Sequence, residues 1–312
     1  MIRTVFLTSL LIFISVSVPA VLFGQERDVK PPFAGAPGGW ESFARGGAVY
    51  QFDSDLDEGG SYDATRFTIQ IGSGYSWDPQ TNVSFSLGYS HDGYDFSGDT
   101  GFGSLNPWED VHTISFGVPV RLEVDDHWTA FVIPSIRSTG ESGAHFDKTV
   151  TGGMLGGFSY RFSDRLTIGP GIGVFSQLEE STTLIPLVII NWKITDKWSL
   201  DTGRGLGATL GPGLTLNYQP NGMWLFGIGG RYEKLRFRLD KNGATGDGVG
   251  EDSSFPLFVS GTYNIDPKSN ISLVSGLELG GELKLEDKDG RTIKEESYDA
   301  GIFLGLTFNT RF

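Results

Sequence analysis

The sequence predicts an all-β protein: a closed antiparallel transmembrane β-barrel of about fourteen strands, with twelve as the nearest alternative. Three observations support this prediction. Apolar residues alternate with small or polar residues along many short segments, short and long connections alternate between those segments, and large aromatic residues gather beside the short connections. Glycine is abundant, with 45 residues in a chain of 312, and no proline-rich low-complexity tract accompanies it. This composition indicates strands and turns rather than disorder.

The first 24 residues have the pattern of a secretory signal peptide. Arg3 precedes an apolar stretch that is broken at Pro19 and followed by small residues, so cleavage is expected near Ala20 or Gly24. An uncleaved N-terminal anchor is the alternative, because the apolar run is close to spanning length. Residues 25–42 are then a predicted periplasmic lead-in, and residues 43–312 the barrel.

The predicted strands each have one apolar face and one face of small, polar or charged residues. This two-residue period is that of a strand whose faces meet different surroundings. The apolar faces of four clear examples are Phe67, Ile69, Ile71, Tyr75 and Trp77; Val83, Phe85, Leu87 and Tyr89; Leu166, Ile168, Ile172 and Val174; and Ile271, Leu273, Leu277, Leu279, Leu283 and Leu285.

The connections between these segments alternate in length. Short turns are expected at 78–80, 125–127, 163–165, 195–197, 219–222 and 266–269. Between them lie mostly longer acidic or glycine-rich loops, such as "HDGYDFSGDTGFGSLN" and "DKNGATGDGVGED", although the connection near "RGLGATLG" is short for its class. Short turns at one rim and longer loops at the other are typical of outer-membrane barrels.

Large aromatic residues on the apolar faces lie within a few residues of the short turns. Once the hairpins stand side by side, these residues come to one level and form an aromatic girdle at the membrane interface. The predicted girdle includes Trp77, Trp128, Tyr160, Phe162, Trp192, Trp198, Tyr218, Trp224, Tyr263 and the final residue, Phe312.

A secreted β-sandwich or propeller also alternates apolar and polar residues, so alternation alone does not decide the fold. The combination of outward aromatic residues at one rim, alternating connection lengths, a glycine-rich inner face and a leader favours the membrane barrel. Closure has a physical cause, because every backbone N–H and C=O in hydrocarbon needs a partner and a closed sheet has no edge.

Composition excludes several classes of function. The chain has no cysteine, which rules out disulfides, thiol nucleophiles and cysteine-based metal or haem sites. Its net charge of −14, or −15 once Arg3 is removed, and the lack of a basic cluster argue against nucleic-acid binding. No cofactor is predicted.

The last strand, "GIFLGLTFNTRF", resembles the C-terminal strand of bacterial outer-membrane proteins. Its apolar face is Ile302, Leu304, Leu306, Phe308 and Phe312. The resemblance implies a bacterial outer-membrane location, recognition by the barrel-assembly machinery and an even number of strands. It also implies short turns and termini in the periplasm, long loops outside, and contact with outer-membrane lipid and lipopolysaccharide.

The second half more specifically resembles a family of uncharacterised bacterial outer-membrane β-barrel proteins, known as a domain of unknown function. The likeness lies in "NWKITDKWSLDTGRGLGATLGPGLTLNYQ", "GIGGRYEKLRFRLD", "GVGEDSSFPLFVSGTY" and "GLELGGELKLED". It implies fold and location, and it brings no activity or site residues.

Charges of both signs fall on the inward parity, and their arrangement decides between two functions. The lumen-lining candidates are Arg66, Arg161, Arg231, Glu233, Glu278, Glu282, Asp299 and Arg311, together with Arg45, Lys193, Asp201 and Lys284. One hypothesis is a channel or passive transporter whose lumen charges tune the passage of small solutes. The other is a structural or surface-interaction barrel with a plugged lumen, whose charges neutralise one another across strands. Arg231, Glu233, Glu278 and Glu282 are expected to converge, with a bulge at Glu233 or Lys234.

Two weaker patterns complete the set of candidates. Asp53, Asp55 and Asp57 alternate as hard-cation ligands do, but Glu58 and Ala64 break the EF-hand pattern, so an ordinary acidic loop is favoured. His91 and His112 flank one long loop, with Ser90, Asp92, Glu109 and Asp110 nearby. An acyl hydrolase at the rim is therefore a third hypothesis, although no GxSxG or HExxH motif supports it and an enzyme is not predicted.

Overall fold

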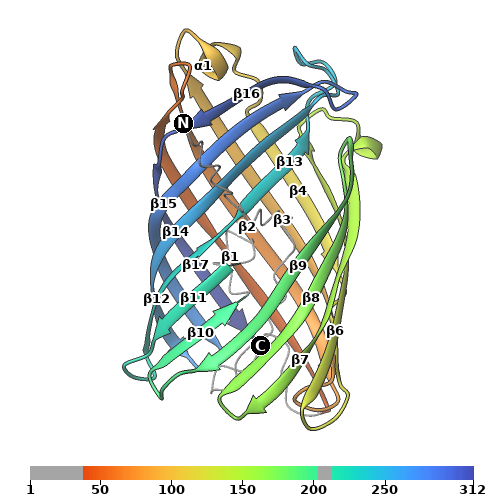
Figure 1. Cartoon of the computed structure of the whole chain (residues 1–312), viewed down its shortest axis with the longest axis vertical. Helices are drawn as coiled ribbons and strands as arrows, with labels where there is room; N and C mark the ends of the chain where they lie inside the picture. Colours follow the sequence, from red (N-terminus) through yellow and green to blue (C-terminus); the bar gives the residue numbers. More distant parts are fainter. Residues whose placement is uncertain (1–37, 203–212) are drawn as a thin grey trace, which may run out of the picture.

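The structure is a computed structural model and describes residues 38–202 and 213–312. Apart from one parallel bridge, the described chain forms a single antiparallel sheet of 17 strand segments that closes into a barrel (Figure 1). The predicted signal peptide and most of the predicted lead-in lie outside the described residues, as does the "RGLGATLG" connection.

The elements follow one another along the chain as short hairpins. They are β1 (Gly39–Asp55), β2 (Ser61–Ser76), β3 (Asn82–Ser97), α1 (Gly101–Leu105), β4 (Asp110–Gly117), β5 (Val120–Glu123), β6 (Trp128–Glu141), a 3₁₀ turn (Phe146–Lys148), β7 (Val150–Ser163), β8 (Leu166–Gln177), β9 (Glu180–Lys193), β10 (Trp198–Thr202), β11 (Gly213–Tyr218), β12 (Trp224–Arg231), β13 (Glu233–Arg238), β14 (Val249–Asp266), β15 (Ser269–Glu286), β16 (Thr292–Tyr298) and β17 (Gly301–Arg311).

The 17 segments make a barrel of 14 strands, because three strands are each interrupted once. β3 pairs with both β4 and β5, β14 with both β12 and β13, and β15 with both β16 and β17. The ring closes where β1 pairs with β17. The predicted fold class and strand number are therefore confirmed, and the twelve-strand alternative is wrong.

Two predicted boundaries differ slightly from the structure. β1 begins at Gly39, so the barrel starts four residues before the predicted Phe43, and Trp40 already pairs with Tyr75. Gly38 and Gly39 obscure this start in the sequence, because glycine interrupts the apolar alternation. The predicted bulge near Glu233 is an interruption at Tyr232, between β12 and β13.

The two ends of the barrel differ, as the connection lengths predict. One end, at the bottom of Figure 1, has short turns, and we call it the short-turn end. The other, the long-loop end, carries α1 and the longer connections, with one exception: the β8–β9 turn consists only of Leu178 and Glu179.

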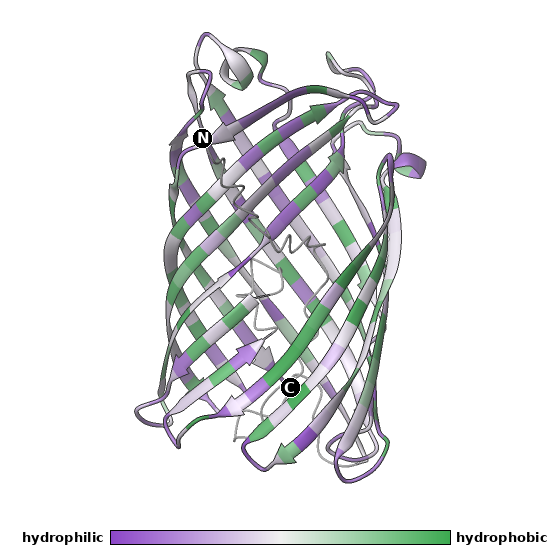
Figure 2. Ribbon diagram, viewed as in Figure 1, coloured by the Kyte–Doolittle hydropathy of each residue, from purple (hydrophilic) through white to green (hydrophobic). Residues whose placement is uncertain are grey.

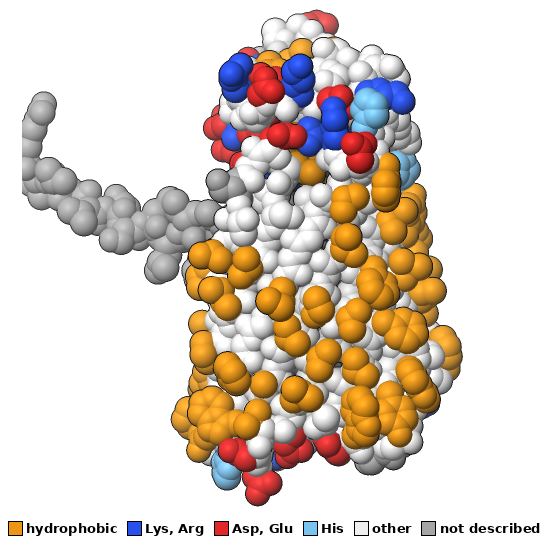
Figure 3. Space-filling view, turned by 90° about the vertical axis from the view of Figure 1, so that its right-hand side faces the viewer, with side chains coloured by type: hydrophobic (Ala, Val, Ile, Leu, Met, Phe, Trp, Pro, Cys, Tyr) orange, Lys and Arg blue, Asp and Glu red, His pale blue; other side chains and the backbone are white. Residues whose placement is uncertain are grey.

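The outer wall is apolar along the height of the barrel. Outward side chains such as Ile228, Leu306 and Ile302 are more than half exposed, and apolar and polar residues alternate along the strands (Figure 2). Apolar side chains cover the wall, while charged ones gather at the ends (Figure 3). In water such a surface would be strongly unfavourable, so its natural surroundings are lipid acyl chains. No helix among the described residues is long and apolar enough to cross a membrane.

At the long-loop end the barrel narrows to a smaller closed ring of nine strand segments. Arg238 at the end of β13 bridges to Gly140 of β6, and Leu56 bridges to Tyr298. The ring runs β6, β13, β14, β15, β16, β1, β2, β3, β4 and back to β6. β7, β8 and β9 therefore lie outside this nine-strand ring.

The nine-strand ring is filled by a packed apolar cluster that we call the outer core. Trp108 and Phe102, from the α1 connection, lie against Phe237 and Tyr94, with Trp108 only 1% exposed. The full cluster is Leu56, Tyr62, Ala64, Tyr94, Phe96, Phe102, Trp108, Val111, Phe237, Leu239, Leu283, Leu285 and Tyr298. The barrel interior is thus solid at this end within the nine-strand ring.

Candidate functional site: the barrel lumen and its closed end

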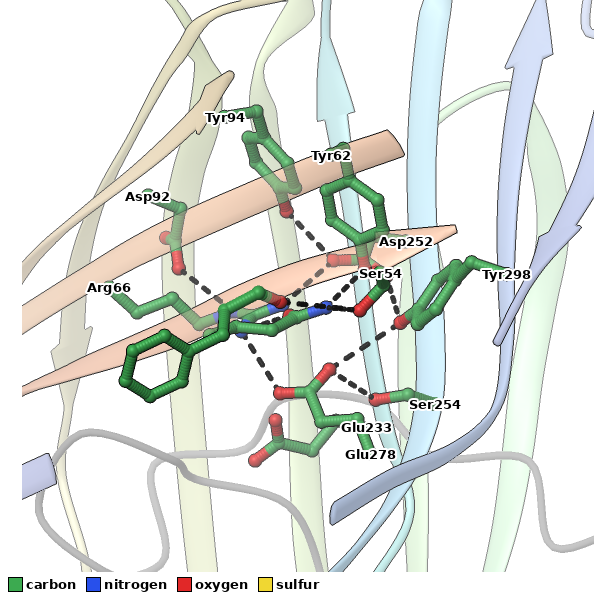
Figure 4. Close-up of polar contacts among 12 residues, drawn as sticks. Ser54, Tyr62, Arg66, Asp92, Tyr94, Glu233, Asp252, Ser254, Glu278 and Tyr298 are labelled. Atoms are coloured by element: carbon green, nitrogen blue, oxygen red, sulfur yellow. Dashed lines mark hydrogen bonds and ion pairs between the residues drawn. The ribbon is translucent and has the colours of Figure 1, made fainter. Parts of the chain in front are cut away.

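A buried polar cluster lies directly against the outer core, with Arg66 of β2 at its centre (Figure 4). The Arg66 guanidinium donates through Nη1 to Gln51 at 2.9 Å and Glu278 at 3.0 Å, and through Nη2 to Asp252 at 3.0 Å. Its Nε lies 3.9 Å from Asp92. We call these five residues the Arg66 cluster. They come from β1, β2, β3, β14 and β15, so the cluster ties together strands that are far apart in sequence.

Three tyrosines of the outer core complete the hydrogen bonding of the Arg66 cluster. Tyr94 and Tyr298 donate to the two oxygens of Asp252 at 3.0 and 3.1 Å, and Tyr62 accepts a bond of 2.8 Å from Gln51. A buried carboxylate loses its hydration, so it is stable only when such donors replace water. The polar cluster and the apolar core are therefore one connected block.

A second buried pair lies where β12 gives way to β13. Arg231 Nε is 2.5 Å from Glu233, and the guanidinium lies 5.4 Å from the centre of the Phe258 ring. The two charged clusters are adjacent, since Glu233 is drawn beside Glu278 in Figure 4. Together Arg66 and Arg231 face Asp92, Asp252, Glu278 and Glu233, so carboxylates outnumber guanidiniums at this level.

The predicted lumen-lining residues fall into three groups in the structure. Arg66, Arg231, Glu278 and Arg311 are buried on the inward face, and Arg161 and Glu233 are half-buried. Glu282 lies on the same face of β15 as Lys284, opposite the outer-core residue Leu283, and Asp299 is exposed between β16 and β17. Of the four residues expected to converge, Arg231, Glu233 and Glu278 lie together, whereas Glu282 does not.

One sector of the inner wall, along β6 to β9, is apolar. Phe131 and Ile133 pack with Phe43 of β1, while Phe175 and Ile185 form a neighbouring cluster. Leu155, Leu187 and Ile189 pack against these clusters. Sequence reasoning missed this wall, although the seven consecutive apolar residues at 184–190 signal a strand that is apolar on both faces.

The residues of the predicted aromatic girdle lie on the outer wall at the short-turn end. Trp77, Trp128, Trp192, Trp198, Trp224, Tyr263 and Phe312 are all exposed. Neighbouring rings touch across strands, as Trp224 and Tyr263 do with centroids 5.1 Å apart.

The two weaker candidates do not form sites of the expected kind. The described residues contain no group of three His, Asp or Glu side chains that could hold a metal, and Asp53 and Asp55 are exposed. Ser90 and Asp92 point inward, away from His91 and His112 on the outer face. His91 instead bonds Asp110 at 2.8 Å, and His112 bonds Tyr89 and Ser142, each at 3.0 Å. The suspected Ser/His/acid constellation is thus split between the two faces of β3.

A closed antiparallel barrel with an apolar outer wall and inward charges defines a transmembrane β-barrel protein of the bacterial outer membrane. No protein-family model matches the sequence, and a search of curated proteins found no match. Among solved structures, the chain is similar to an outer-membrane channel from Pseudomonas putida F1, with 10% identity, 92% of this chain and 100% of that chain covered, and a TM-score of 0.46.

Two further solved structures are similar at the same level. A FadL homologue of Pseudomonas aeruginosa matches with 11% identity over 87% of this chain and 90% of that chain, at a TM-score of 0.47. The toluene transporter TodX of Pseudomonas putida matches with 12% identity over 87% of this chain and 90% of that chain, at a TM-score of 0.41. The assignment of the fold depends on the strand pairings described above.

Proposed function

We propose that this protein is a gated channel or passive transporter for small solutes, closed at its long-loop end in this conformation. The observation that carries the proposal is the inner wall of the fourteen-strand barrel. Away from the outer core, the inward positions of β2 and β3 are small or polar, as along Thr68, Gln70, Ser84 and Ser86. Such a wall suits a wetted lumen better than a packed interior.

The substrate class follows from the two unlike sectors of the inner wall. The sector along β6 to β9 offers Phe131, Leu155, Phe175 and Ile189, while β1 to β3 offer polar and charged groups such as Gln70. A small solute with an apolar body and a polar end could contact both sectors at once. We infer that such amphipathic solutes pass more readily than sugars of similar size.

A structural barrel with a plugged lumen is the second candidate, and the outer core favours it. The thirteen residues of this cluster close the nine-strand ring. The two functions make different demands on the outer core: a channel must be able to bypass or loosen it, whereas a structural barrel never does.

Conductance of the purified protein in a planar lipid bilayer separates the two functions. Stepwise currents are expected from the native chain, with ion selectivity that changes when Glu278 or Arg231 is replaced by a residue of opposite charge. Arg165→Glu is the matched control, because Arg165 lies in an exposed turn at the short-turn end. Silence of the native chain, and also of a variant whose core is weakened by Trp108→Ala, would favour the structural barrel.

We further propose that the chain belongs to the family of uncharacterised outer-membrane β-barrel proteins that its second half resembles. We infer insertion by the barrel-assembly machinery with the short-turn end in the periplasm, and contact of the long loops with lipopolysaccharide. Labelling of a cysteine placed in a long loop of intact cells by an impermeant thiol reagent tests this orientation, because the chain has no cysteine of its own.

A further inference from the structure

The β8–β9 turn reaches across the long-loop end and contacts β13. The Nε of Arg236 donates to the backbone oxygen of Leu178 at 2.7 Å, and its Nη1 lies 3.4 Å from Glu180. Two residues further along β13, the guanidinium of Arg238 pairs with Glu179. All three residues at the tip of the hairpin are therefore held by two arginines of β13.

The contacts between the hairpin tip and β13 are made by the side chains of Arg236 and Arg238, and not by a backbone hydrogen-bond ladder. β9 pairs with β8 and β10, while β13 pairs with β14 and, at Arg238 alone, with β6. Within the described ranges no ladder connects β9 to β13. The β7–β9 sector lies outside the nine-strand ring, so its tip can move without breaking that ring.

Both arginines are also held by contacts that do not involve the hairpin tip. Arg236 is buried and also bonds Glu251, at 2.8 Å, and Glu286. Arg238 is buried and donates to the backbone oxygens of Lys148 and Asp247. By contrast, the side chains of Glu179 and Glu180 are each about one third exposed, at 32% and 35%. Release of the hairpin would leave both arginines paired with other groups.

We propose that the β8–β9 hairpin is a strap that closes the long-loop end and opens by releasing Arg236 and Arg238. The inference rests on the proposed channel function, for which it supplies the gate. The strap can open because the Glu179 and Glu180 carboxylates, each about one third exposed, regain hydration on release while both buried arginines keep their other partners. The exposed side of each pair is open to screening by salt. It closes specifically because a guanidinium offers several directed donors to the tip.

A disulfide can lock the strap, because the tip also lies against the β15–β16 connection. A Cβ built on Gly290 would lie 3.2 Å from the Cβ of Glu179, close to the spacing of about 3.5–4.5 Å found in disulfides, and 2.8 Å from the Glu179 backbone oxygen, so the tip must shift slightly to accept it. The double variant Glu179→Cys/Gly290→Cys introduces the only two thiols of the chain. Gly290 has a φ of +77°, so the substitution is strained, but the strain is present in both redox states of the variant.

The first experiment measures single-channel openings of this double variant in a planar bilayer, oxidised and then reduced. We expect the oxidised form to lose most of its openings and reduction to restore them. The two single-cysteine variants are the matched controls, and each should open as often after the oxidant as before it, because neither can form the cross-link; in Glu179→Cys the loss of the carboxylate is then common to both measurements. An oxidised form that is shown to be cross-linked and still opens as often as the reduced form overturns the proposal.

The second experiment measures the position of the strap by the distance between two spin labels and does not depend on conduction. Spin labels at Gln177→Cys, beside the tip, and at Asp289→Cys leave Glu179 and Glu180 in place and report the separation of the tip from the β15–β16 connection in detergent and in lipid. Arg238→Gln removes the pair with Glu179, and Glu180→Gln removes the pair with Arg236. Each of these changes, and added salt, should broaden the distance distribution towards longer values. Lys294→Gln is the matched control, because Lys294 pairs with Glu58 elsewhere at the same end and should leave the distribution unchanged.

The two experiments distinguish failure of the strap from failure of the channel. If the distance distribution broadens but the protein never conducts, the strap is supported and the channel function is refuted. If the protein conducts but the distance distribution stays narrow in Arg238→Gln, in Glu180→Gln and at high salt, the channel function is supported and the strap is refuted. If Arg238→Gln does not fold, Glu180→Gln and added salt still decide the question.

Discussion

At the scale of single residues, Asp252 shows what parity in the sequence could and could not predict. The inward positions of Arg66, Arg231 and Glu278 follow from the two-residue period. Asp252 was not among the predicted residues, although it shares the inward parity of Ser254 and Phe258 on β14. Opposite it, β15 carries one extra residue between Leu279 and Glu282, which reverses the parity there and explains why Glu282 does not face the lumen as predicted. Two partners of Arg66, Asp252 and Glu278, lie more than 180 residues away in the sequence, a pairing that no local pattern encodes.

Removal of Asp252 should be strongly destabilising. Asp252→Ala leaves Arg66 without one of its buried partners, leaves the Tyr94 hydroxyl without its acceptor and leaves the Tyr298 hydroxyl with only the longer contact, of 3.4 Å, to Glu278. We expect the free energy of unfolding in detergent micelles to fall by about 3–5 kcal/mol, as for other broken buried ion pairs. Asp299→Ala, at an exposed position, should change it by less than about 0.5 kcal/mol. Equal effects of the two changes would contradict the cluster.

Asp247 should make the stability of the loops at the long-loop end depend on pH. Hydrogen bonds from His145 and Lys148 lower the pKa of the Asp247 carboxyl from 3.8 to about 2. A lowered folded-state pKa means that the carboxylate stabilises the folded loops above the ordinary pKa and that this stabilisation is lost as pH falls from 3.8 through about 2. The difference in unfolding free energy between the native chain and Asp247→Asn should therefore vanish across this window. A difference that stays constant with pH would show that the contact does not contribute.

At the scale of elements, the sheet depends on close approach of neighbouring strands. Gly276 of β15 lies opposite Phe258 of β14, and a Cβ at this position would be 2.0 Å from the backbone oxygen of Leu257. Inward glycines of this kind were predicted only as a small-residue face. Their steric necessity depends on the local twist of two strands, which the sequence pattern does not specify.

Gly276→Ala should therefore push β14 and β15 apart. We expect a loss of about 1–3 kcal/mol in unfolding free energy, the usual cost of overpacking. Gly222→Ala is the matched control, because Gly222 lies in the β11–β12 turn with no atom within 4 Å of the added methyl group. Chemical denaturation of both variants in the same micelles measures the effect, and an equal loss in both would refute the steric argument.

At the scale of the whole molecule, the sequence predicted a closed fourteen-strand barrel because membrane strands repeat a simple pattern. Each strand alternates apolar and polar residues, and short turns alternate with longer loops along the chain, apart from the two-residue β8–β9 turn. The nine-strand ring was not predictable, since it depends on two single bridges, Arg238 with Gly140 and Leu56 with Tyr298. The outer core had a weak signal in Tyr62, Tyr94 and Phe96, which are large aromatic residues on the inward parity.

The seven tryptophans can test the placement of the whole barrel in a membrane. Six are exposed on the outer wall or its short-turn rim, and Trp108 is buried in the outer core. In single-tryptophan variants with the others changed to phenylalanine, lipids with brominated acyl chains should quench Trp224 strongly. They should leave Trp108 almost unquenched. Quenching of Trp108 as strong as that of Trp224 would show that the outer core is open to lipid, contrary to this fold.

The pairing of β1 with β17 imposes an order on assembly. Residues 43–51 align with residues 303–311, so the first strand has a partner on only one side until the last strand arrives. Until then both strands present unsatisfied backbone groups, which invite association with other chains. The entropy cost of joining such distant segments grows only slowly with length, so the delay affects the rate of maturation more than the final stability. Substitutions along this junction should therefore slow insertion and favour aggregation of immature chains, even where the finished barrel tolerates them.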